Sequence, residues 1–190
     1  MLNNGFNNLW PTPVYLDKIK DEKLVDQVCQ EILLNVDLSK PLTEFQEYDI
    51  LHDGPEIFQT FRDQVVWPLF ETYLKNWNLS FKDFSNKRIR SWLTGAHSGY
   101  NIPIHNHSGA ALSAIFYLLV DNQMQGGDLV FLDPRLNANR GYEDQFKSLF
   151  ENKLYSPNSG EVVVFPSFLY HQTLPFSGSI RLAMPVDLFV

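Results

Sequence analysis

Three of the five histidines in this chain have a spacing that could build a metal site. His105 and His107 are two positions apart, and side chains at positions i and i+2 of a β-strand point to the same face. His171 lies in another candidate strand, after a turn at residues 166–167. A lone His-x-His pair is common on surfaces, but three histidines that fit one strand-based geometry favour a metal site. Imidazole binds iron, zinc, copper and nickel alike, so the residue type does not choose the metal.

Arg181 is the second residue with a chemical consequence. It precedes an apolar run, Leu182 to Val186, that we expect to be a strand. Burying a guanidinium costs free energy unless an anion meets it. The anion is either a substrate carboxylate, bound through two parallel hydrogen bonds, or a structural partner such as Asp187 or another acid. The sequence supports both interpretations equally.

The elements that must position these side chains lie in the second half of the chain. From about residue 88, Gly, Pro, Asn and Ser interrupt short β-branched and aromatic runs, which predicts antiparallel strands in a sandwich or barrel. The candidate strands are Ile89 to Leu93, His105 to His107, Leu112 to Val120, Asp128 to Leu132, Glu161 to Phe165, Tyr170 to Pro175 and Ile180 to Leu188.

The first 87 residues are predicted to be largely helical. Residues 21–36 repeat apolar side chains with a helical period, and a second such pattern runs from Pro55 to Tyr73. Pro68 should kink or split this second helix. We therefore expect one domain over residues 1–190, with a helical support region at 1–87 and a β core at 88–190 that carries the metal site.

Composition excludes several classes of protein. The formal net charge is -7, and only the cluster Lys87, Arg88 and Arg90 is locally basic, which argues against nucleic acid as a partner. The single cysteine, Cys29, excludes an internal disulfide and a cysteine-based zinc site, and we expect a buried, inert thiol. The sequence shows no signal peptide and no membrane span, so we expect a soluble protein of the cytoplasm, or of the host cytoplasm if it is phage-encoded.

The ordered set of motifs resembles the 2-oxoglutarate- and iron(II)-dependent oxygenases. The resemblance is strongest to an uncharacterised bacterial and phage branch and covers nearly the whole chain. Its motifs are Leu9 to Val14, His105 to His107, Phe116 to Leu118, Gly126 to Phe131, Leu132 to Arg135, Pro157 to Gly160, Val164 to Ser167, His171 and Arg181.

The resemblance implies a mainly β fold, the cupin-like double-stranded β-helix or jelly roll, with iron(II) at one mouth of the barrel. It implies that His105 and His171 are iron ligands, that Arg181 binds the C5 carboxylate of 2-oxoglutarate and that Tyr117 assists. The enzyme would be a dioxygenase, a hydroxylase that uses 2-oxoglutarate and O2 and releases succinate and CO2.

Two positions depart from the pattern of the wider superfamily. Its iron ligands are usually two histidines and one carboxylate, whereas position 107 is histidine. We expect His107 to be the third ligand, with Asp133 or Asp128 as the alternative. The residue two positions after the arginine commonly carries a hydroxyl group that shares the co-substrate carboxylate, and here it is Ala183.

The substrate would be recognised at the rim of the site, for which Tyr100, Arg135 and Arg140 are the candidates. A protein or peptide side chain, such as a prolyl residue, is expected by analogy, or else a small molecule. Two alternatives stay open: a three-histidine, cupin-like metal enzyme that does not use 2-oxoglutarate, and a non-catalytic jelly-roll binding protein. The helical region either only covers the barrel or also forms a homodimer face.

Overall fold

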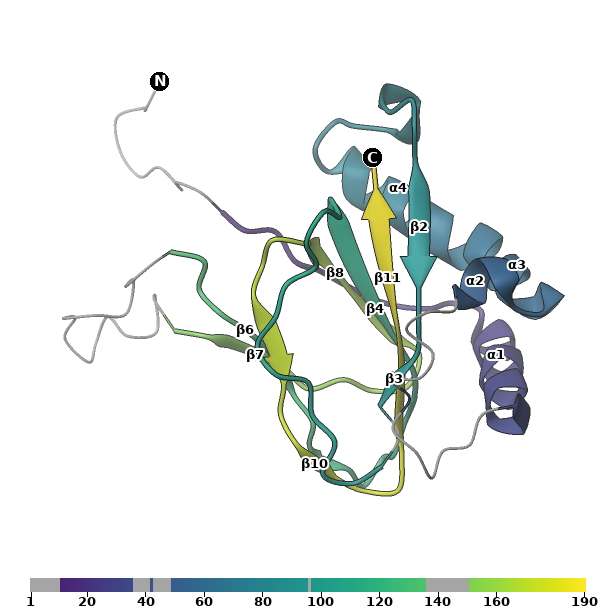
Figure 1. Ribbon diagram of the computed structural model, residues 1–190, viewed down its shortest axis with the longest axis vertical. Coiled ribbons are helices and arrows are strands. Elements are labelled where there is room, and N and C mark those ends of the chain that lie inside the picture. The colour runs from purple at the N-terminus through teal and green to yellow at the C-terminus, as the bar shows by residue number, and fades with distance from the viewer. Residues whose placement is uncertain (1–10, 36–41, 43–48, 96, 136–150) are drawn as a thin grey trace.

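The computed structural model describes residues 11–35, 42, 49–95, 97–135 and 151–190 (Figure 1). Antiparallel strands form two layers that face each other, and the helices cover the outer face of the larger layer. This arrangement is the predicted jelly roll. No helix in the described ranges is long and apolar enough to cross a membrane.

The larger sheet has six strands. Its order is β1-β8-β4-β11-β2, and β3 also pairs with β11. The strands are β1 (Tyr15–Lys18), β2 (Arg88–Ser91), β3 (Thr94–Gly95), β4 (Leu112–Val120), β8 (Glu161–Pro166) and β11 (Arg181–Phe189).

The smaller layer contains a three-stranded sheet of order β7-β6-β9 and a two-stranded ribbon, β10-β5. Its strands are β5 (Gln125–Gly126), β6 (Leu129–Phe131), β7 (Lys153–Tyr155), β9 (His171–Thr173) and β10 (Phe176–Ser177). His105 joins this layer through a single bridge to His171. The expected strand over residues 105–107 is therefore only a one-residue pairing.

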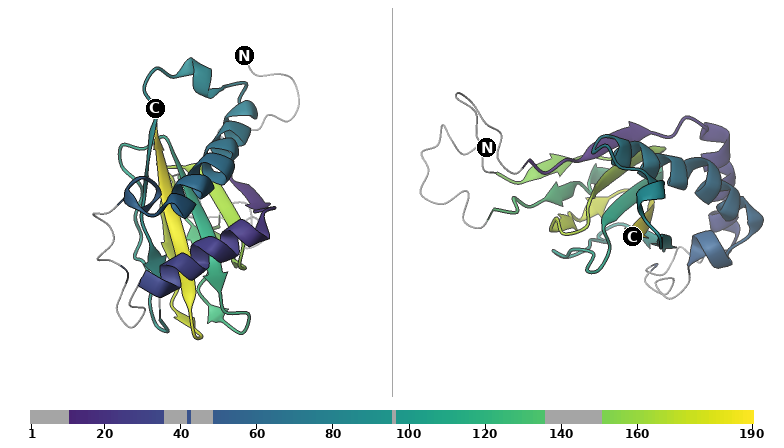
Figure 2. Two further views of the ribbon diagram at one scale, coloured as in Figure 1. Left: turned by 90° about the vertical axis from the view of Figure 1, so that its right-hand side faces the viewer. Right: turned by 90° about the horizontal axis from the view of Figure 1, so that it is seen from above.

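The helices lie across the larger sheet, as the left view of Figure 2 shows. They are α1 (Glu22–Asn35), α2 (Ile50–Asp53), α3 (Glu56–Phe61), a π-helix (Arg62–Val66), α4 (Trp67–Lys75) and a short 3-10 helix (Phe81–Asp83). The predicted split near Pro68 is confirmed. The π-helix separates α3 from α4, and Pro68 lies in the first turn of α4. Cys29 of α1 is buried, and burial raises the pKa of its thiol to about 12, as an inert thiol requires.

β11 separates two hydrophobic clusters. Side chains at its even positions, from Leu182 to Leu188, pack with the helices, whereas Ala183 belongs to the inner cluster between the two layers. Because side chains alternate across a strand, the odd positions point into the barrel. Arg181 and Asp187 therefore both face the inside.

The short strands β1, β3, β5, β7 and β10 were not predicted. They have two to four residues each, and the pairing with a neighbouring strand defines them rather than a local pattern of apolar residues. β1 also shows that the first 87 residues are not only helical, since it pairs with β8 at the edge of the larger sheet.

Candidate metal centre

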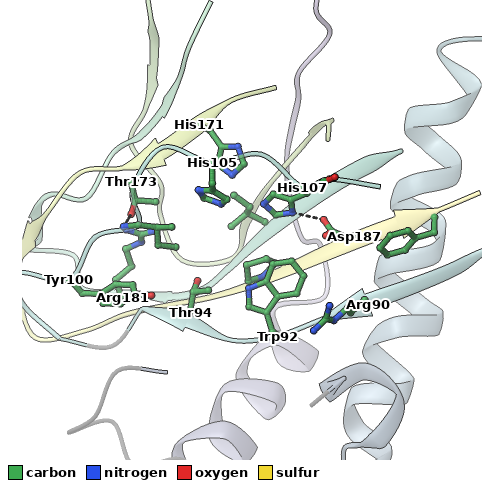
Figure 3. Close-up of a pocket in the computed structure, with 15 residues that line it drawn as sticks. Arg90, Trp92, Thr94, Tyr100, His105, His107, His171, Thr173, Arg181 and Asp187 are labelled. Atoms are coloured by element: carbon green, nitrogen blue, oxygen red, sulfur yellow. Dashed lines mark hydrogen bonds and ion pairs between the residues drawn. The ribbon is translucent and has the colours of Figure 1, made fainter. Parts of the chain in front are cut away.

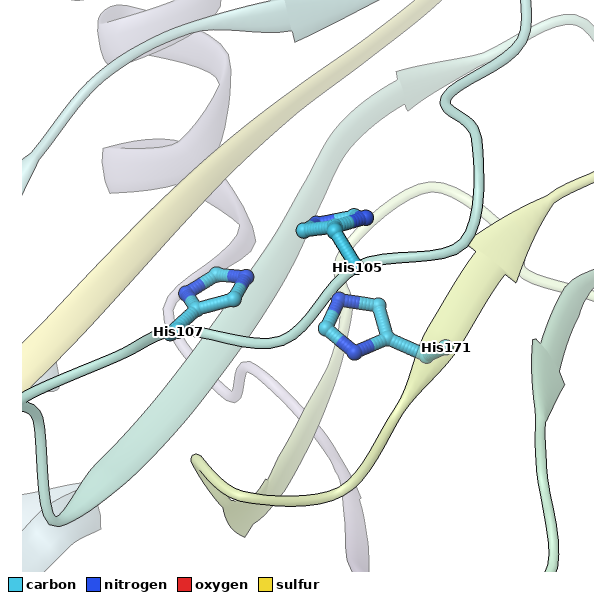
Figure 4. A group of neighbouring side chains, drawn as sticks. All are labelled: His105, His107 and His171. Carbon is cyan, nitrogen blue, oxygen red and sulfur yellow. The ribbon is translucent and has the colours of Figure 1, made fainter.

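The three histidines converge inside the barrel (Figure 4). One potential ligand atom from each of His105, His107 and His171 lies within 4.8 Å of the others. The ring centroids are 4.3 Å apart for His105 and His171, and 5.1 Å apart for His107 and His171. This spacing suits three ligands of one metal ion.

Tertiary pairing holds the backbone of the three residues. The amides of His105 and His171 each donate to the other residue's carbonyl oxygen at 2.9 Å, and the amide of His107 donates to the carbonyl of Ser167 at 3.0 Å. The prediction that His105 and His107 lie on one side of the chain is confirmed, with the rings stacked at a centroid distance of 5.3 Å.

Hydrogen bonds at Nδ1 orient all three imidazoles. His105 Nδ1 lies 2.8 Å from the carbonyl oxygen of Pro103, and His171 Nδ1 lies 3.0 Å from that of Leu169. His107 Nδ1 lies 2.5 Å from Asp187 Oδ1. Each Nδ1 thus has an acceptor for its proton, which leaves the lone pair of Nε2 for a metal ion.

Burial keeps two of the imidazoles neutral, which is the form that binds a metal. It lowers the pKa of His171 to about 3 and also holds the pKa of His105 below its ordinary value. Both rings therefore carry no proton on Nε2 at neutral pH.

Arg181 is buried with 1% of its surface exposed. Within the described part of the chain, its Nε and Nη1 atoms have no hydrogen-bond partner, nor does the neighbouring Tyr117 hydroxyl. The guanidinium carbon lies 5.7 Å from the Tyr117 ring centroid. Burial lowers the pKa of Arg181, but an arginine side chain keeps its proton in proteins. The prediction that Asp187 could be a structural ion-pair partner of Arg181 is wrong, because Asp187 pairs with His107 instead.

Arg181 and the three histidines line one cavity of about 310 Å³ (Figure 3). Arg181 lies at one end with Tyr100 and Thr173, the histidines lie along the middle, and Arg90 lies at the other end. The expected rim residue Tyr100 is therefore part of the cavity. A carboxylate at the Arg181 end of the cavity would give the unpartnered Nε and Nη1 donors of Arg181 an acceptor, so the site fits 2-oxoglutarate.

Thr94 and Asp187 line the cavity but were not predicted as site residues, since Asp187 was named only as a possible structural partner of Arg181. Thr94 of β3 lies opposite Ala183 of β11 and lines the cavity. The family pattern has a hydroxyl group at the position of Ala183, and Thr94 offers one on the neighbouring strand. Alternation along β11 could have placed Asp187 on the same face as Arg181. No local signal identifies Thr94, because only the tertiary pairing brings β3 to β11.

Other predicted residues lie away from the cluster. Of the described residues, only the three histidines form the candidate metal group; the alternatives Asp128 and Asp133 do not belong to it. Asp128 accepts a hydrogen bond from Ser156, and Asp133 pairs with Arg135. Arg135 is not among the residues that line the cavity. Arg140 lies outside the described residues.

Comparisons with known proteins give a family and a fold. A family model described as "Putative 2OG-Fe(II) oxygenase" matches residues 90–187. HygX from Streptomyces hygroscopicus, solved with nickel and 2-oxoglutarate bound, is similar with a TM-score of 0.64 and 13% identity, over 94% of this chain and 83% of that chain. A Pseudomonas putida prolyl-4-hydroxylase is similar with a TM-score of 0.54 and 16% identity, over 92% of this chain and 85% of that chain. At these identities the likeness shows the fold alone. No curated protein matches this chain significantly.

Proposed function

This chain belongs to the 2OG-Fe(II) oxygenase family, and we propose that it is an iron(II)- and 2-oxoglutarate-dependent dioxygenase that hydroxylates its substrate. Residues 1–190 act as one oxygenase domain. His105, His107 and His171 hold the iron, and Arg181 binds the C5 carboxylate of 2-oxoglutarate.

The observation that carries this proposal is the unpartnered Arg181 at the end of the histidine-lined cavity. A buried cation without an anion is strongly destabilising, so such a group is retained where a ligand supplies the anion. The Tyr117 hydroxyl, also buried and without a partner, supplies a second donor to the same carboxylate. A site that did not use an anionic co-substrate would have no need of either donor.

The residues of the chain orient and shield the reactants. Arg181, assisted by Tyr117, would hold the C5 carboxylate of 2-oxoglutarate, and the three histidines would hold the metal. Trp92 lies beside His107, with ring centroids 5.5 Å apart, and helps to exclude water from the metal. When bound, iron(II), 2-oxoglutarate and O2 supply the oxidation, which yields succinate, CO2 and a hydroxylated substrate.

The substrate enters at the other end of the cavity, where Arg90 and Phe189 form part of the lining. A protein or peptide side chain, or a small molecule, fits this proposal. Tyr100 lines the cavity next to Arg181. Bound 2-oxoglutarate would therefore lie between Tyr100 and the substrate. Arg135 and Arg140 remain predicted rim residues: Arg135 does not line the cavity, and Arg140 lies outside the described residues.

A second candidate is a three-histidine metal enzyme that does not use 2-oxoglutarate. The replacement of a carboxylate ligand by His107 and the loss of a hydroxyl at Ala183 favour it. The buried, unpartnered Arg181 counts against it.

Anaerobic titration of iron(II) and then 2-oxoglutarate into metal-free protein tests the proposal. We expect the weak visible charge-transfer band of an iron-bound 2-oxo acid. The band should weaken in Arg181→Ala and His107→Ala, and should persist in Arg135→Ala, the control that removes an exposed arginine. Iron binding without a band would favour the second candidate. Failure to bind iron would favour a non-catalytic binding protein.

A further inference from the structure

We infer that Asp187 is a positioning residue that supplies, through His107, the negative charge that a carboxylate ligand brings to iron in related sites. This inference rests on the proposed metal centre. It accounts for the histidine at position 107, where the wider superfamily has a carboxylate ligand. A carboxylate is still present, but it acts on the metal through a hydrogen bond to His107 instead of binding the metal directly.

The first step is the geometry of the pair. Asp187 Oδ1 lies 2.5 Å from His107 Nδ1, and the side chains are 10% and 4% exposed (Figure 3, dashed line). Such short hydrogen bonds between ring nitrogens and ionised oxygens are stronger than neutral ones. With the proton of His107 directed at Asp187, Nε2 is held as a metal ligand and its basicity is raised.

The second step is the way the carboxylate is held. Ser113 is the cross-strand partner of Asp187 on β4, and its hydroxyl donates to Asp187 Oδ1 at 2.7 Å. Ser113 Oγ also lies 2.9 Å from Ser167 Oγ, and the carbonyl of Ser167 accepts the amide of His107. Strands β4 and β11, the turn after β8 and the histidine segment thus form one buried polar network, which fixes the carboxylate relative to the imidazole.

The third step is the charge balance. Among the described residues, the ion pair of Asp187 is with His107, although Arg90 lies opposite Asp187 on β2 and lines the same cavity. A buried carboxylate needs a positive charge nearby. A metal ion on Nε2 supplies that charge through the ring. Three neutral imidazoles would leave both positive charges of iron(II) uncompensated, and Asp187 removes one of them, as a carboxylate ligand does.

The fourth step is the position of Asp187 on β11. Arg181 and Asp187 are six residues apart on one strand, which corresponds to about 20 Å, and both line the cavity. One strand therefore carries both the receptor for the co-substrate anion and the charge that compensates the metal.

Asp187→Asn tests the inference, because the amide keeps the shape and an acceptor oxygen but removes the charge. Two measurements on the protein without 2-oxoglutarate are needed: the affinity for cobalt(II) by calorimetry, and the midpoint potential of the iron(III)/iron(II) couple. We expect the affinity to fall about 10- to 100-fold and the potential to rise, since iron(III) loses more stabilisation than iron(II).

Ser113→Ala is the matched second variant. It removes a hydrogen bond that draws negative charge away from the carboxylate, so the potential should shift in the opposite direction. Circular dichroism reports whether each variant folds. Unchanged potentials in both variants would reduce Asp187 to a structural role, even if the wild type binds iron and gives the 2-oxo acid band. A wild type that binds no metal would instead overturn the proposed function itself.

Discussion

Thr94 lies opposite Ala183 in the antiparallel pairing of β3 with β11, and its side chain lines the cavity beside Arg181. Cross-strand partners point to the same face of a sheet. The hydroxyl group that the family pattern places two residues after the arginine is therefore present on the neighbouring strand. We expect it to share the co-substrate carboxylate with Arg181.

Thr94→Val removes this hydroxyl without changing the shape of the side chain. The dissociation constant for 2-oxoglutarate, measured by anaerobic titration of the iron-loaded protein, should rise about 10- to 100-fold, the value of one hydrogen bond to a charged group. Ala183→Ser in the Thr94→Val background should recover part of the loss. An unchanged affinity in Thr94→Val would show that the hydroxyl does not contact the co-substrate.

Gly95→Ala should disturb the same pairing. Gly95 has φ +101°, and an added Cβ would lie 1.9 Å from the backbone oxygen of Arg181. β3 must then move away from β11. We expect a loss of about 2–4 kcal/mol in the free energy of unfolding, measured by urea denaturation, together with weaker 2-oxoglutarate binding.

Gly99→Ala is the control for this prediction. Gly99 also has a positive φ, +88°, but a Cβ there would meet no atom within 4 Å. Only the conformational cost of about 1–2 kcal/mol remains. Equal losses in the two variants would contradict the role of the close approach to Arg181.

Arg181→Met should stabilise the ligand-free protein while abolishing 2-oxoglutarate binding. The native guanidinium is buried, its Nε and Nη1 atoms lack hydrogen-bond partners in the described chain, and an apolar side chain of similar length removes this cost. Replacing buried charges by apolar groups stabilises proteins by about 1–4 kcal/mol. Thermal denaturation of wild type and variant, each with and without 2-oxoglutarate, measures both effects.

Arg135→Met is the control for Arg181→Met, because its ion pair with Asp133 is partly exposed. Its loss should change stability by less than about 1 kcal/mol and leave co-substrate binding intact. A destabilised Arg181→Met protein would mean that the guanidinium has a structural partner after all.

The stability of the metal-free protein should fall as the pH is lowered below 7. Burial holds the pKa of His171 at about 3, below the 6.5 of the unfolded chain. The unfolded state therefore binds more protons between these values, and stability rises with pH in that window. One such proton corresponds to a slope of about 1.4 kcal/mol per pH unit. His171→Gln, measured by urea denaturation with a chelator present, should show a shallower slope, whereas an unchanged slope would assign the pH dependence to other groups.

The main elements could be predicted from the sequence because their signals are local. Strand β4 was predicted with the bounds that the structure shows, and helix α1 lies within the predicted range. Strand β4 is a nearly continuous apolar run of nine residues, and α1 repeats buried apolar side chains with a helical period over 14 residues. Strands β3 and β5 have two residues each, too few for any period to be recognised.

The sequence by itself determined which residue types are available for chemistry: His105, His107 and His171 for a metal, and Arg181 for an anion. Only the tertiary structure decided how their charges are matched. Asp187 was a candidate partner of Arg181, yet it binds His107, and the Nε and Nη1 atoms of Arg181 have no hydrogen-bond partner in the described chain. The physical reason is that side chains alternate along a strand, so the sequence predicts which of them share a face. Which residues of different strands lie opposite each other depends on the packing of the whole barrel.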